Sequence, residues 1–573
     1  MHEILGQARN DVEGEGFMRN YPLYSVDEIT NLRDLVGNAA VKYGEKTAFA
    51  WFEGTVVTKK TFEQFKQDVD SLGTALYRLG FAPDSAKKGE LPPRIAVIGE
   101  NSYDWLVSYF AVVNGGNVIV PLDKDLHEDG LRNILEESGA SAIIYSDSYA
   151  DMFDDFKRTR KTKSLKTFIN MRFDLPGILA TGREILENGE LEYLEAEIDE
   201  PKTCAIIFTS GTTGLAKGVE LSHRSLTYNV VNGHKLALIN GDSVLVLPLH
   251  HTYGFGATVI STILRGKMCF INSELKYVLR DIQEGKPEFI CVVPLFVESF
   301  YKNITSNIKK QGKEKLIATM TKMVNGARKV GIDARRVVFK QILDAFGGKL
   351  DLLVSGGAAL NADLIQKFNN FGITIIEGYG ITECSPIVAL NRNKWVKAGS
   401  VGQVVPGVEV KIIEENEDGE GEICVRGPIV MNGYYGKPDI TASVLDEDGW
   451  FRTGDIGYLD EDGFLFITGR KKNLIILANG KNIHPEELED LIQQLDEVEE
   501  VIVRESGRNI LAEIFPNYEF EGFIGMDKKR MEKHIWRLIK DINRDLPIYK
   551  RIKDIEIRDV EFDKTTTKKI KRW

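Results

Sequence analysis

The chain has 573 residues and a formal net charge of −12, with 43% hydrophobic and 28% charged residues. This length is too great for one hydrophobic core, so we expect roughly two to four domains, and the composition excludes an intrinsically disordered chain. The acidity disfavours nonspecific nucleic-acid binding, and five cysteines without a CxxC pair favour a reduced, cytoplasmic protein over a disulfide framework.

The first 200 residues or so alternate between helical and strand-like patterns. Residues 61–80 place Phe62, Phe65, Val69, Leu72, Leu76 and Leu79 on one helix face, which Gly80 ends. Short apolar runs at 94–99, 117–122 and 141–146 are typical of buried parallel strands, with helical patterns at 102–116 and 129–140 between them. This alternation predicts a doubly wound α/β sheet.

A short segment after the first of these units, "FTSGTTGLAKGV" at residues 208–219, is rich in glycine, hydroxyl groups and one lysine. It does not match the Walker loop, because Lys217 lies three residues after Gly214 rather than next to it. Hydroxyl groups and close backbone N–H groups still suit an anion. The preceding strand and the following helical pattern place this loop at the carboxyl edge of a sheet, where ligands bind in α/β folds. The alternative, a flexible Gly/Thr hairpin, would not need the lysine.

The strand-like pattern returns at residues 243–248, 267–272, 289–294, 350–357 and 373–380. After Gly399 the pattern changes to short β segments separated by turns. A last unit has helical patterns at 484–495 and 527–546 and a strand at 499–505. We therefore expect a large N-terminal domain of doubly wound sheets with a β-rich subdomain (1–471) and a small, mobile α+β domain (472–573).

Two regions depart from the overall acidity. Residues 302–349 contain 12 Lys or Arg against 3 Asp or Glu, and residues 528–573 contain 16 against 8. Such regions indicate a localised anionic ligand or surface, or simply two solvated helical faces. No apolar run is long enough for a spanning helix and the N-terminus lacks an apolar signal core, so we expect neither in this chain.

Further motifs follow the glycine-rich loop in a fixed order: "PLHHTYG" (248–254), "VSGGAAL" (354–360), "GYGITECSP" (378–386), "TGD" (453–455), "GRKKNLIILANGKNIHPEELE" (469–489) and "KTTTKKIKR" (564–572). Together they resemble the adenylate-forming superfamily of acyl-CoA synthetases, luciferases and peptide-synthetase adenylation domains, over essentially the whole chain. Ala216 stands where the family usually has proline. Lys568 stands where it usually has glycine, which leaves the register between Lys568 and Lys569 open, with Lys569 favoured.

The resemblance implies an enzyme, an AMP-forming acid–thiol ligase that uses ATP, Mg²⁺ and coenzyme A. A carboxylate attacks the α-phosphate of ATP to give acyl-AMP and pyrophosphate, and a thiol then displaces AMP. Because both nucleophiles are adequate by themselves, we expect catalysis by positioning and charge stabilisation.

The family's residue roles carry over to matching positions. Thr382 would contact the α-phosphate, Glu383 would hold Mg²⁺, and His251 would lie at the acyl site, with the small residues Gly254, Gly256 and Ala257 leaving room for the chain. Lys569 would reach the α-phosphate and Lys472 would be the hinge. The remaining binding residues are Thr209, Ser210, Gly211, Thr212, Thr213, Gly214 and Lys217 for the β- and γ-phosphates; Gly356, Gly357, Gly378 and Tyr379 for adenine; Asp455 and Arg470 for ribose; and Gly480 for the pantetheine chain.

Among the branches of this superfamily, the sequence is most similar to long-chain fatty acyl-CoA synthetases, which also carry a helical insertion before the "SGG" strand. Medium-chain or aryl acids, and an acyl carrier protein as acceptor in place of coenzyme A, remain alternatives; a nucleotide-binding protein without catalysis would need neither Glu383 nor Lys569.

Within the basic insertion, one apolar stripe suggests either an interfacial helix at the inner face of a membrane or ordinary packing with solvated cations. The stripe consists of Leu316, Ile317, Met320, Met323, Val324, Ala327 and Val330, and its flanking cations are Lys309, Lys310, Lys313, Lys315, Arg328, Lys329, Arg335 and Arg336.

Overall fold

The computed structural model describes residues 21–85, 90–209, 216–476, 482–507, 509–564 and 570–572, without the side chains of 476 and 482. These residues form two compact units. The larger unit contains 21–409 and 425–451, and the smaller contains 410–424 and the described residues from 452 onward. The division expected at 471/472 remains a prediction, and each unit is described separately below.

One sheet of the larger unit has seven strands in the order β18-β8-β7-β4-β3-β5-β6. Strands β7, β4, β3, β5 and β6 run parallel, and β8 and β18 are antiparallel additions at one edge. The predicted runs at 94–99, 117–122 and 141–146 are its central strands. Their bounds are Arg94–Ile98 (β3), Val118–Pro121 (β4), Ala142–Tyr145 (β5), Thr167–Asn170 (β6), Thr203–Thr209 (β7), Lys217–Ser222 (β8) and Gly433–Tyr434 (β18).

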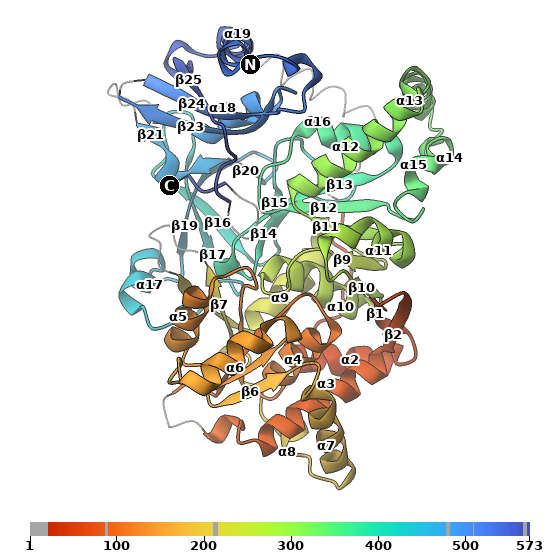
Figure 1. Ribbon diagram of the computed structural model, residues 1–573, viewed down its shortest axis with the longest axis vertical. Coiled ribbons are helices and arrows are strands. Elements are labelled where there is room, and N and C mark those ends of the chain that lie inside the picture. Colours follow the sequence, from red (N-terminus) through yellow and green to blue (C-terminus); the bar gives the residue numbers. More distant parts are fainter. Residues whose placement is uncertain are drawn as a thin grey trace. The chain divides into compact units, whose positions relative to one another are not determined.

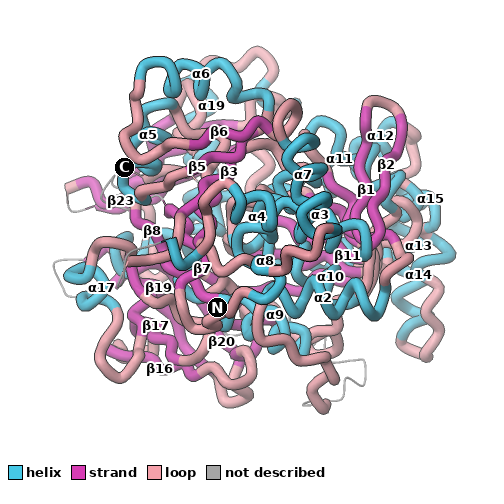
Figure 2. Tube along the Cα trace, turned by 90° about the horizontal axis from the view of Figure 1, so that it is seen from below, coloured by secondary structure: helices cyan, strands magenta, loops and turns pink. Residues whose placement is uncertain are grey.

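Helices cover this sheet (Figures 1 and 2), with α3 (Phe62–Arg78) packed against α4 and α7. A capping box starts α3: the Thr61 hydroxyl accepts from the Gln64 N–H, and the Gln64 side chain accepts from the Thr61 N–H. The predicted apolar face is buried up to Leu76, whereas Leu79 lies past the helix end and is exposed. The other helices are Leu32–Tyr43 (α2), Tyr103–Asn114 (α4), Glu128–Ser138 (α5), Ala150–Thr159 (α6), Leu175–Glu187 (α7), Glu192–Glu195 (α8) and His223–Leu236 (α9).

The second sheet of the larger unit has the strand order β15-β14-β13-β12-β11-β9-β10-β1-β2. It is parallel from β13 to β1, with antiparallel strands β14, β15 and β2 at its ends. The strands are Thr47–Glu53 (β1), Val56–Thr61 (β2), Ser243–Leu245 (β9), Cys269–Ile271 (β10), Phe289–Val292 (β11), Leu352–Gly356 (β12), Thr374–Gly380 (β13), Ile387–Leu390 (β14) and Gly402–Val404 (β15).

Helices on this sheet include the whole basic insertion, and Figure 1 shows α13 to α15 extending beyond β11–β13. The bounds are Ser261–Arg265 (α10), Val278–Gly285 (α11), Pro294–Lys310 (α12), Glu314–Arg328 (α13), Arg335–Val338 (α14), Lys340–Asp344 (α15) and Ala362–Phe371 (α16), with a π-helical segment at Gly254–Ile260. Helix α17 (Pro438–Val444) instead packs against β18 of the first sheet. The doubly wound α/β architecture expected from the sequence is confirmed.

The apolar stripe of the insertion does not form one buried face. Val324 is 4% exposed, and Ile317 and Met320 pack against the core, but Leu316 and Met323 are 53% and 69% exposed. At about 100° per residue, the seven-residue spacing of Leu316 and Met323 places them at one margin of the stripe. The apolar stripe is therefore wider than the part of the core against which α13 packs. Ile317, Met320 and Val324 face that core, and Leu316 and Met323 face solvent.

The smaller unit carries most of the strands β16, β17, β19 and β20, which neighbour one another in that order, and a three-stranded sheet β23-β24-β25. The β-rich region and the α+β end expected from the sequence are both present, although β24 and β25 were not predicted. The elements are Glu409–Ile413 (β16), Gly421–Arg426 (β17), Phe451–Leu459 (β19), Phe464–Arg470 (β20), Ile475–Ile476 (β21), Asn482–Ile483 (β22), Pro485–Gln493 (α18), Val498–Ser506 (β23), Asn509–Pro516 (β24), Lys528–Asp545 (α19) and Asp554–Ile557 (β25).

All five cysteines are buried, and none of them is part of a disulfide. In the described part of the chain, no helix combines the length and apolar character needed to cross a bilayer.

Candidate functional site

The glycine-rich loop begins and ends on paired strands. Thr209 at the end of β7 lies opposite Lys217 at the start of β8, and the predicted phosphate-binding residues Ser210, Gly211, Thr212, Thr213 and Gly214 lie outside the described residues. The helical pattern predicted after the loop, at residues 223–236, is α9. Strand β8, which was not predicted, lies between the loop and this helix and pairs with β7 on one side and with β18 on the other.

A tyrosine that the sequence analysis did not single out links two predicted site residues. The ammonium of Lys217 lies 4.9 Å from the ring centroid of Tyr434, and the Tyr434 hydroxyl donates a 2.8 Å hydrogen bond to Oε1 of Glu383. Burial, followed by the Glu383 charge, raises the pKa of Tyr434, so the hydroxyl remains a donor. Lys217 and Glu383 are 166 residues apart in the chain, yet they share this one side chain. Tyr434 lies in β18, in a segment outside every motif, and no feature of the sequence marks it.

The turn that carries Thr382 and Glu383 is held by Asn229 of α9. The buried Asn229 amide donates to the carbonyls of Cys384 (3.1 Å) and Ile387 (2.7 Å), and its oxygen accepts from the Ile387 N–H. Glu383 also accepts at its backbone carbonyl from the Met431 N–H. These contacts satisfy four backbone groups in and beside the turn, which fixes its position.

Glycines of two predicted motifs meet at the carboxyl ends of adjacent parallel strands. Gly356 of β12 pairs in register with Gly378 of β13. A Cβ at Gly356 would lie 3.2 Å from the Tyr253 ring, and one at Gly378 would lie 3.0 Å from Leu390. Gly357 has φ +86°, a conformation that favours glycine. The absence of side chains at Gly356 and Gly378 therefore lets Tyr253 and Leu390 approach the backbone closely, at the sheet edge where α/β folds bind ligands.

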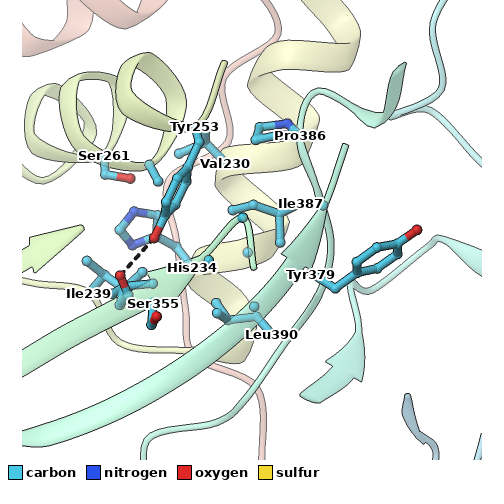
Figure 3. Close-up of a pocket in the computed structure, with 17 residues that line it drawn as sticks. Val230, His234, Ile239, Tyr253, Ser261, Ser355, Tyr379, Pro386, Ile387 and Leu390 are labelled. Atoms are coloured by element: carbon cyan, nitrogen blue, oxygen red, sulfur yellow. Dashed lines mark hydrogen bonds between the residues drawn. The ribbon is translucent and has the colours of Figure 1, made fainter. Parts of the chain in front are cut away.

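These glycines and Tyr379 line a largely apolar cavity with about 620 Å³ of empty space, part of it open to solvent. Figure 3 shows Tyr379 at one side of the cluster and Tyr253 across it, with the Tyr253 hydroxyl donating to the carbonyl of Val354 at 2.7 Å. Apolar contacts come from α9, the π-helical segment, β12, β13 and β14 of the larger unit. The lining residues are Val230, Gly233, His234, Ile239, Tyr253, Ala257, Ser261, Val354, Ser355, Gly356, Gly357, Gly378, Tyr379, Gly380, Pro386, Ile387 and Leu390.

The predicted acyl-site histidine, His251, is not one of the residues that line this cavity, although Tyr253 and Ala257 of the same segment are. Its ring lies 4.1 Å from that of His250, centroid to centroid. Burial and the charge of Lys124 lower the pKa of His250 to about 3, so this ring is neutral near neutrality. Of Gly254, Gly256 and Ala257, which were expected to leave room for an acyl chain, Ala257 lines this cavity. Gly254 does not line it, and a Cβ at that position would lie 2.7 Å from the Pro248 carbonyl oxygen.

In the smaller unit, Asp455 and Arg470 form a pair across β19 and β20. They lie opposite each other in the ladder, and Arg470 Nε is 2.8 Å from Asp455 Oδ1. The Thr453 hydroxyl, which donates to the Ile423 carbonyl, accepts from the Asp455 N–H. Asp455 is 3% exposed and its position is fixed by these contacts, so the structure brings the two residues predicted to bind ribose together.

The remaining predicted residues also belong to the smaller unit. Burial and the charges of Arg470 and Arg572 lower the pKa of Lys472. Gly480, Lys568 and Lys569 lie outside the described residues, but Lys564 and Ile570 on either side of the lysines pair with each other. Arg572 binds Glu489, so this end of the chain is attached to the domain that contains α18.

The carboxylate of Glu383 suits a magnesium ion that is also bound by the phosphates of a nucleotide. Among the described residues, no cluster of three or more His, Cys, Asp or Glu side chains could enclose a metal. Mg²⁺ commonly uses one or two carboxylates with substrate phosphates and water. Glu383, which shares Tyr434 with Lys217, supplies one carboxylate.

Comparison with known proteins agrees with this geometry. Residues 37–435 match the model of the AMP-binding enzyme family, and residues 472–572 match that of the AMP-binding enzyme C-terminal domain. The chain is 30% identical to a long-chain-fatty-acid–CoA ligase of Mycobacterium bovis, over 72% of this chain and 70% of that one. It is 26% identical to a chloroplastic long-chain-fatty-acid–[acyl-carrier-protein] ligase of Arabidopsis thaliana, over 85% and 76%.

Among solved structures, the fold is similar to that of an anthranilate CoA ligase in complex with anthranoyl-AMP, with a TM-score of 0.73, 21% identity and 96% of both chains covered. The resemblance drawn from the motifs is confirmed: the chain belongs to the AMP-binding enzyme family.

Proposed function

We propose that this protein is an ATP-dependent acid–thiol ligase that activates a carboxylic acid, principally a long-chain fatty acid, as acyl-AMP and transfers it to coenzyme A. The observation that carries the proposal is the convergence of Lys217, Tyr434 and Glu383 at the edge of β7 and β8. A protein that only binds nucleotide would not need a carboxylate held beside the phosphate-loop lysine. The relatives named long-chain-fatty-acid–CoA ligase support the choice of substrate class.

In the first half-reaction, an oxygen of the acid's carboxylate attacks the α-phosphorus of ATP. The bond between that phosphorus and the bridging oxygen breaks, and pyrophosphate leaves with the electron pair. Lys217 and the loop of residues 209–214 stabilise the β- and γ-phosphates, and Thr382 contacts the α-phosphate. Magnesium, held by Glu383, would neutralise phosphate charge when bound. Tyr379 covers adenine beside the glycines of β12 and β13, and Asp455 and Arg470 bind ribose.

In the second half-reaction, the sulfur of coenzyme A attacks the acyl carbon, the carbon–oxygen bond to AMP breaks, and the thiol proton is released. The domain of residues 472–573 swings about Lys472 between the two steps, so that Lys569 serves adenylation and Gly480 lines the path of pantetheine. This division rests on the resemblance, and it is supported by the match of residues 472–572 to a separate C-terminal domain.

The function is tested by ATP–pyrophosphate exchange with a panel of fatty and aryl acids, followed by detection of the thioester. Exchange that depends on a long-chain acid and yields acyl-CoA is expected. The alternative acceptor, an acyl carrier protein, is supported by one relative and predicts exchange without acyl-CoA, with acylation of added holo carrier protein instead. Absence of exchange with every acid would refute the proposal.

The exposed margin of α13 supports contact with an anionic membrane surface, where long-chain acids partition. Leu316 and Met323 lie seven residues apart on α13, and Val330 lies in the turn that follows the end of the helix at Arg328. Each of the three is preceded by an exposed lysine. Arg335 and Arg336, by contrast, bind Asn369 and the Leu350 carbonyl within the protein, so they are not part of this surface. The surface consists of Lys315, Leu316, Lys322, Met323, Lys329 and Val330. At about 1 kcal/mol per cation, the three lysines provide about 3 kcal/mol against an anionic leaflet.

Sedimentation with phosphatidylglycerol vesicles at low and high salt tests this surface. We expect salt-sensitive binding that is lost in the triple variant Lys315→Glu/Lys322→Glu/Lys329→Glu. The matched control, Lys529→Glu/Lys533→Glu/Lys540→Glu in α19, makes the same change of charge in the other basic region. Equal loss in both variants, or no binding at low salt, would refute a specific role for α13.

A further inference from the structure

The wall of the largely apolar cavity includes polar side chains, and the hydroxyls of Tyr253 and Ser261 donate to backbone carbonyls. Two others are His234 and Ser355. His234, in the last turn of α9, is 1% exposed, and Arg265 Nε donates to its Nδ1 at 3.3 Å. A guanidinium can only donate, so Nδ1 carries no proton and the neutral ring has its N–H at Nε2. Burial and the Arg265 charge lower the pKa of His234 to about 3, which keeps the ring neutral.

Neither group has a hydrogen-bond partner among the described residues. This holds for Nε2 of His234 and for Oγ of Ser355, which belongs to β12 and is also 1% exposed. Both residues line the cavity, next to Ile239 and Val354. A buried donor left without an acceptor is unfavourable, so such groups in native proteins ordinarily have a partner.

The position of the pair indicates which end of a ligand it would meet. Figure 3 shows His234 and Ser355 on the side of Tyr253 remote from Tyr379. If Tyr379 covers adenine, the acid's carboxylate lies toward Tyr379 and its far end reaches His234 and Ser355. No lysine or arginine lines the cavity among the described residues, and Arg265 lies behind His234, to which it donates. A charged group in the cavity would therefore have no direct ion-pair partner.

We propose that the acid this enzyme activates carries an uncharged oxygen, as a hydroxyl or keto group, at the end remote from its reactive carboxylate, and that His234 and Ser355 bind that oxygen. The inference rests on the proposed ligase function and narrows its substrate from fatty acids in general to oxygenated ones. The His234 N–H donates to the oxygen, and the Ser355 hydroxyl donates to it or accepts from it.

The test compares kcat/KM in the exchange assay for pairs of acids of equal chain length, with and without a terminal hydroxyl, over medium and long chains. At the length that spans the cavity, the wild type should prefer the hydroxylated acid by about tenfold or more. His234→Leu and Ser355→Ala should each reduce that ratio about tenfold. His234→Gln should retain most of it, because its amide supplies an N–H and an acceptor for Arg265. Ile239→Val changes the shape of the same wall without its polarity and should leave the ratio intact.

Equal kcat/KM for both acids of every pair in the wild type would overturn the inference, since solvent would then satisfy the two groups. The inference would also be overturned if the kcat/KM ratio of hydroxylated to unmodified acid stayed at the wild-type value in Ser355→Ala and in His234→Gln/Ser355→Ala. These two variants keep the test decisive if His234→Leu fails to fold. Calorimetric titration with each acid measures binding without catalysis. Tighter binding of the hydroxylated acid without any exchange would therefore support the binding site and refute only the ligase function, and equal affinity would refute the site.

Discussion

Replacing Tyr434 with phenylalanine tests whether the link between Lys217 and Glu383 is functional. The change removes the hydroxyl that donates to Glu383 at 2.8 Å and retains the ring 4.9 Å from the Lys217 ammonium. A hydrogen bond to a charged group contributes about 1.5–3 kcal/mol. If Glu383 needs that bond to keep its orientation, Tyr434→Phe should lower the rate of adenylation about 10- to 100-fold.

The assay is ATP–pyrophosphate exchange at a series of Mg²⁺ concentrations. The loss in Tyr434→Phe should be greatest at low Mg²⁺ and partly restored at high Mg²⁺, because a carboxylate that is less well oriented binds the ion more weakly. Tyr434→Ala should lose more, since it also removes the ring beside Lys217. The control is Tyr435→Phe, which removes a hydroxyl from the neighbouring residue, whose backbone N–H donates to the Gly218 carbonyl and whose ring packs against the core. A Tyr434→Phe enzyme with wild-type exchange and Mg²⁺ dependence would refute the link.

Three further predictions follow from the same site and its surroundings. Lys569→Ala should reduce adenylation about 10²- to 10³-fold but leave thioester formation from supplied acyl-AMP largely intact. If Lys568→Ala shows this selective defect instead, Lys568 is the catalytic lysine. Equal loss in both half-reactions would refute domain rotation. Lys472→Pro, which fixes φ near −65°, should permit adenylate formation, measured in a single turnover, and block thioester formation; normal overall turnover would remove Lys472 from the hinge. Glu377→Gln should make the melting temperature less sensitive to pH between about 4.5 and 7, measured by scanning fluorimetry, for the reason argued below.

The elements that the sequence predicted well are those in which pattern and packing agree. Continuous apolar runs such as 94–99 can be buried only on both faces of a sheet, and Thr61 with Gln64 caps α3 through local contacts alone. The motifs likewise predicted Gly356 and Gly378, which meet because parallel strands end at one edge. Strand β8 was missed although it pairs locally with β7, because the glycine-rich motif masks its short strand pattern and its other partner, β18, lies more than 200 positions away.

The side chains that support the site were not predictable in the same way. Asn229 acts through its distance to Cys384 and Ile387, which the chain order does not show. Tyr434 is one of 19 tyrosines, and only the position of β18 beside β8 brings it to Glu383. The apolar stripe of α13 was read correctly as helical, but its width relative to the surface beneath it decides which residues are exposed, and that width depends on tertiary packing.

Glu377 is another residue whose behaviour depends on the fold, and its titration has a definite sign. It lies in β13 beside the glycine edge, 8% exposed, and burial raises its pKa from 4.5 to about 7. Below pH 4.5 it is protonated in both the folded and the unfolded protein. Between pH 4.5 and 7 the unfolded chain releases the proton and the folded chain retains it, so the free energy of unfolding falls as the pH rises, by about 3 kcal/mol in all.

Glutamine has nearly the same size and shape as glutamic acid but does not titrate. The wild type should therefore lose more stability than Glu377→Gln from pH 5 to pH 8, while other titrating groups affect both proteins alike; parallel pH profiles would show that the Glu377 carboxyl is not held protonated by the fold.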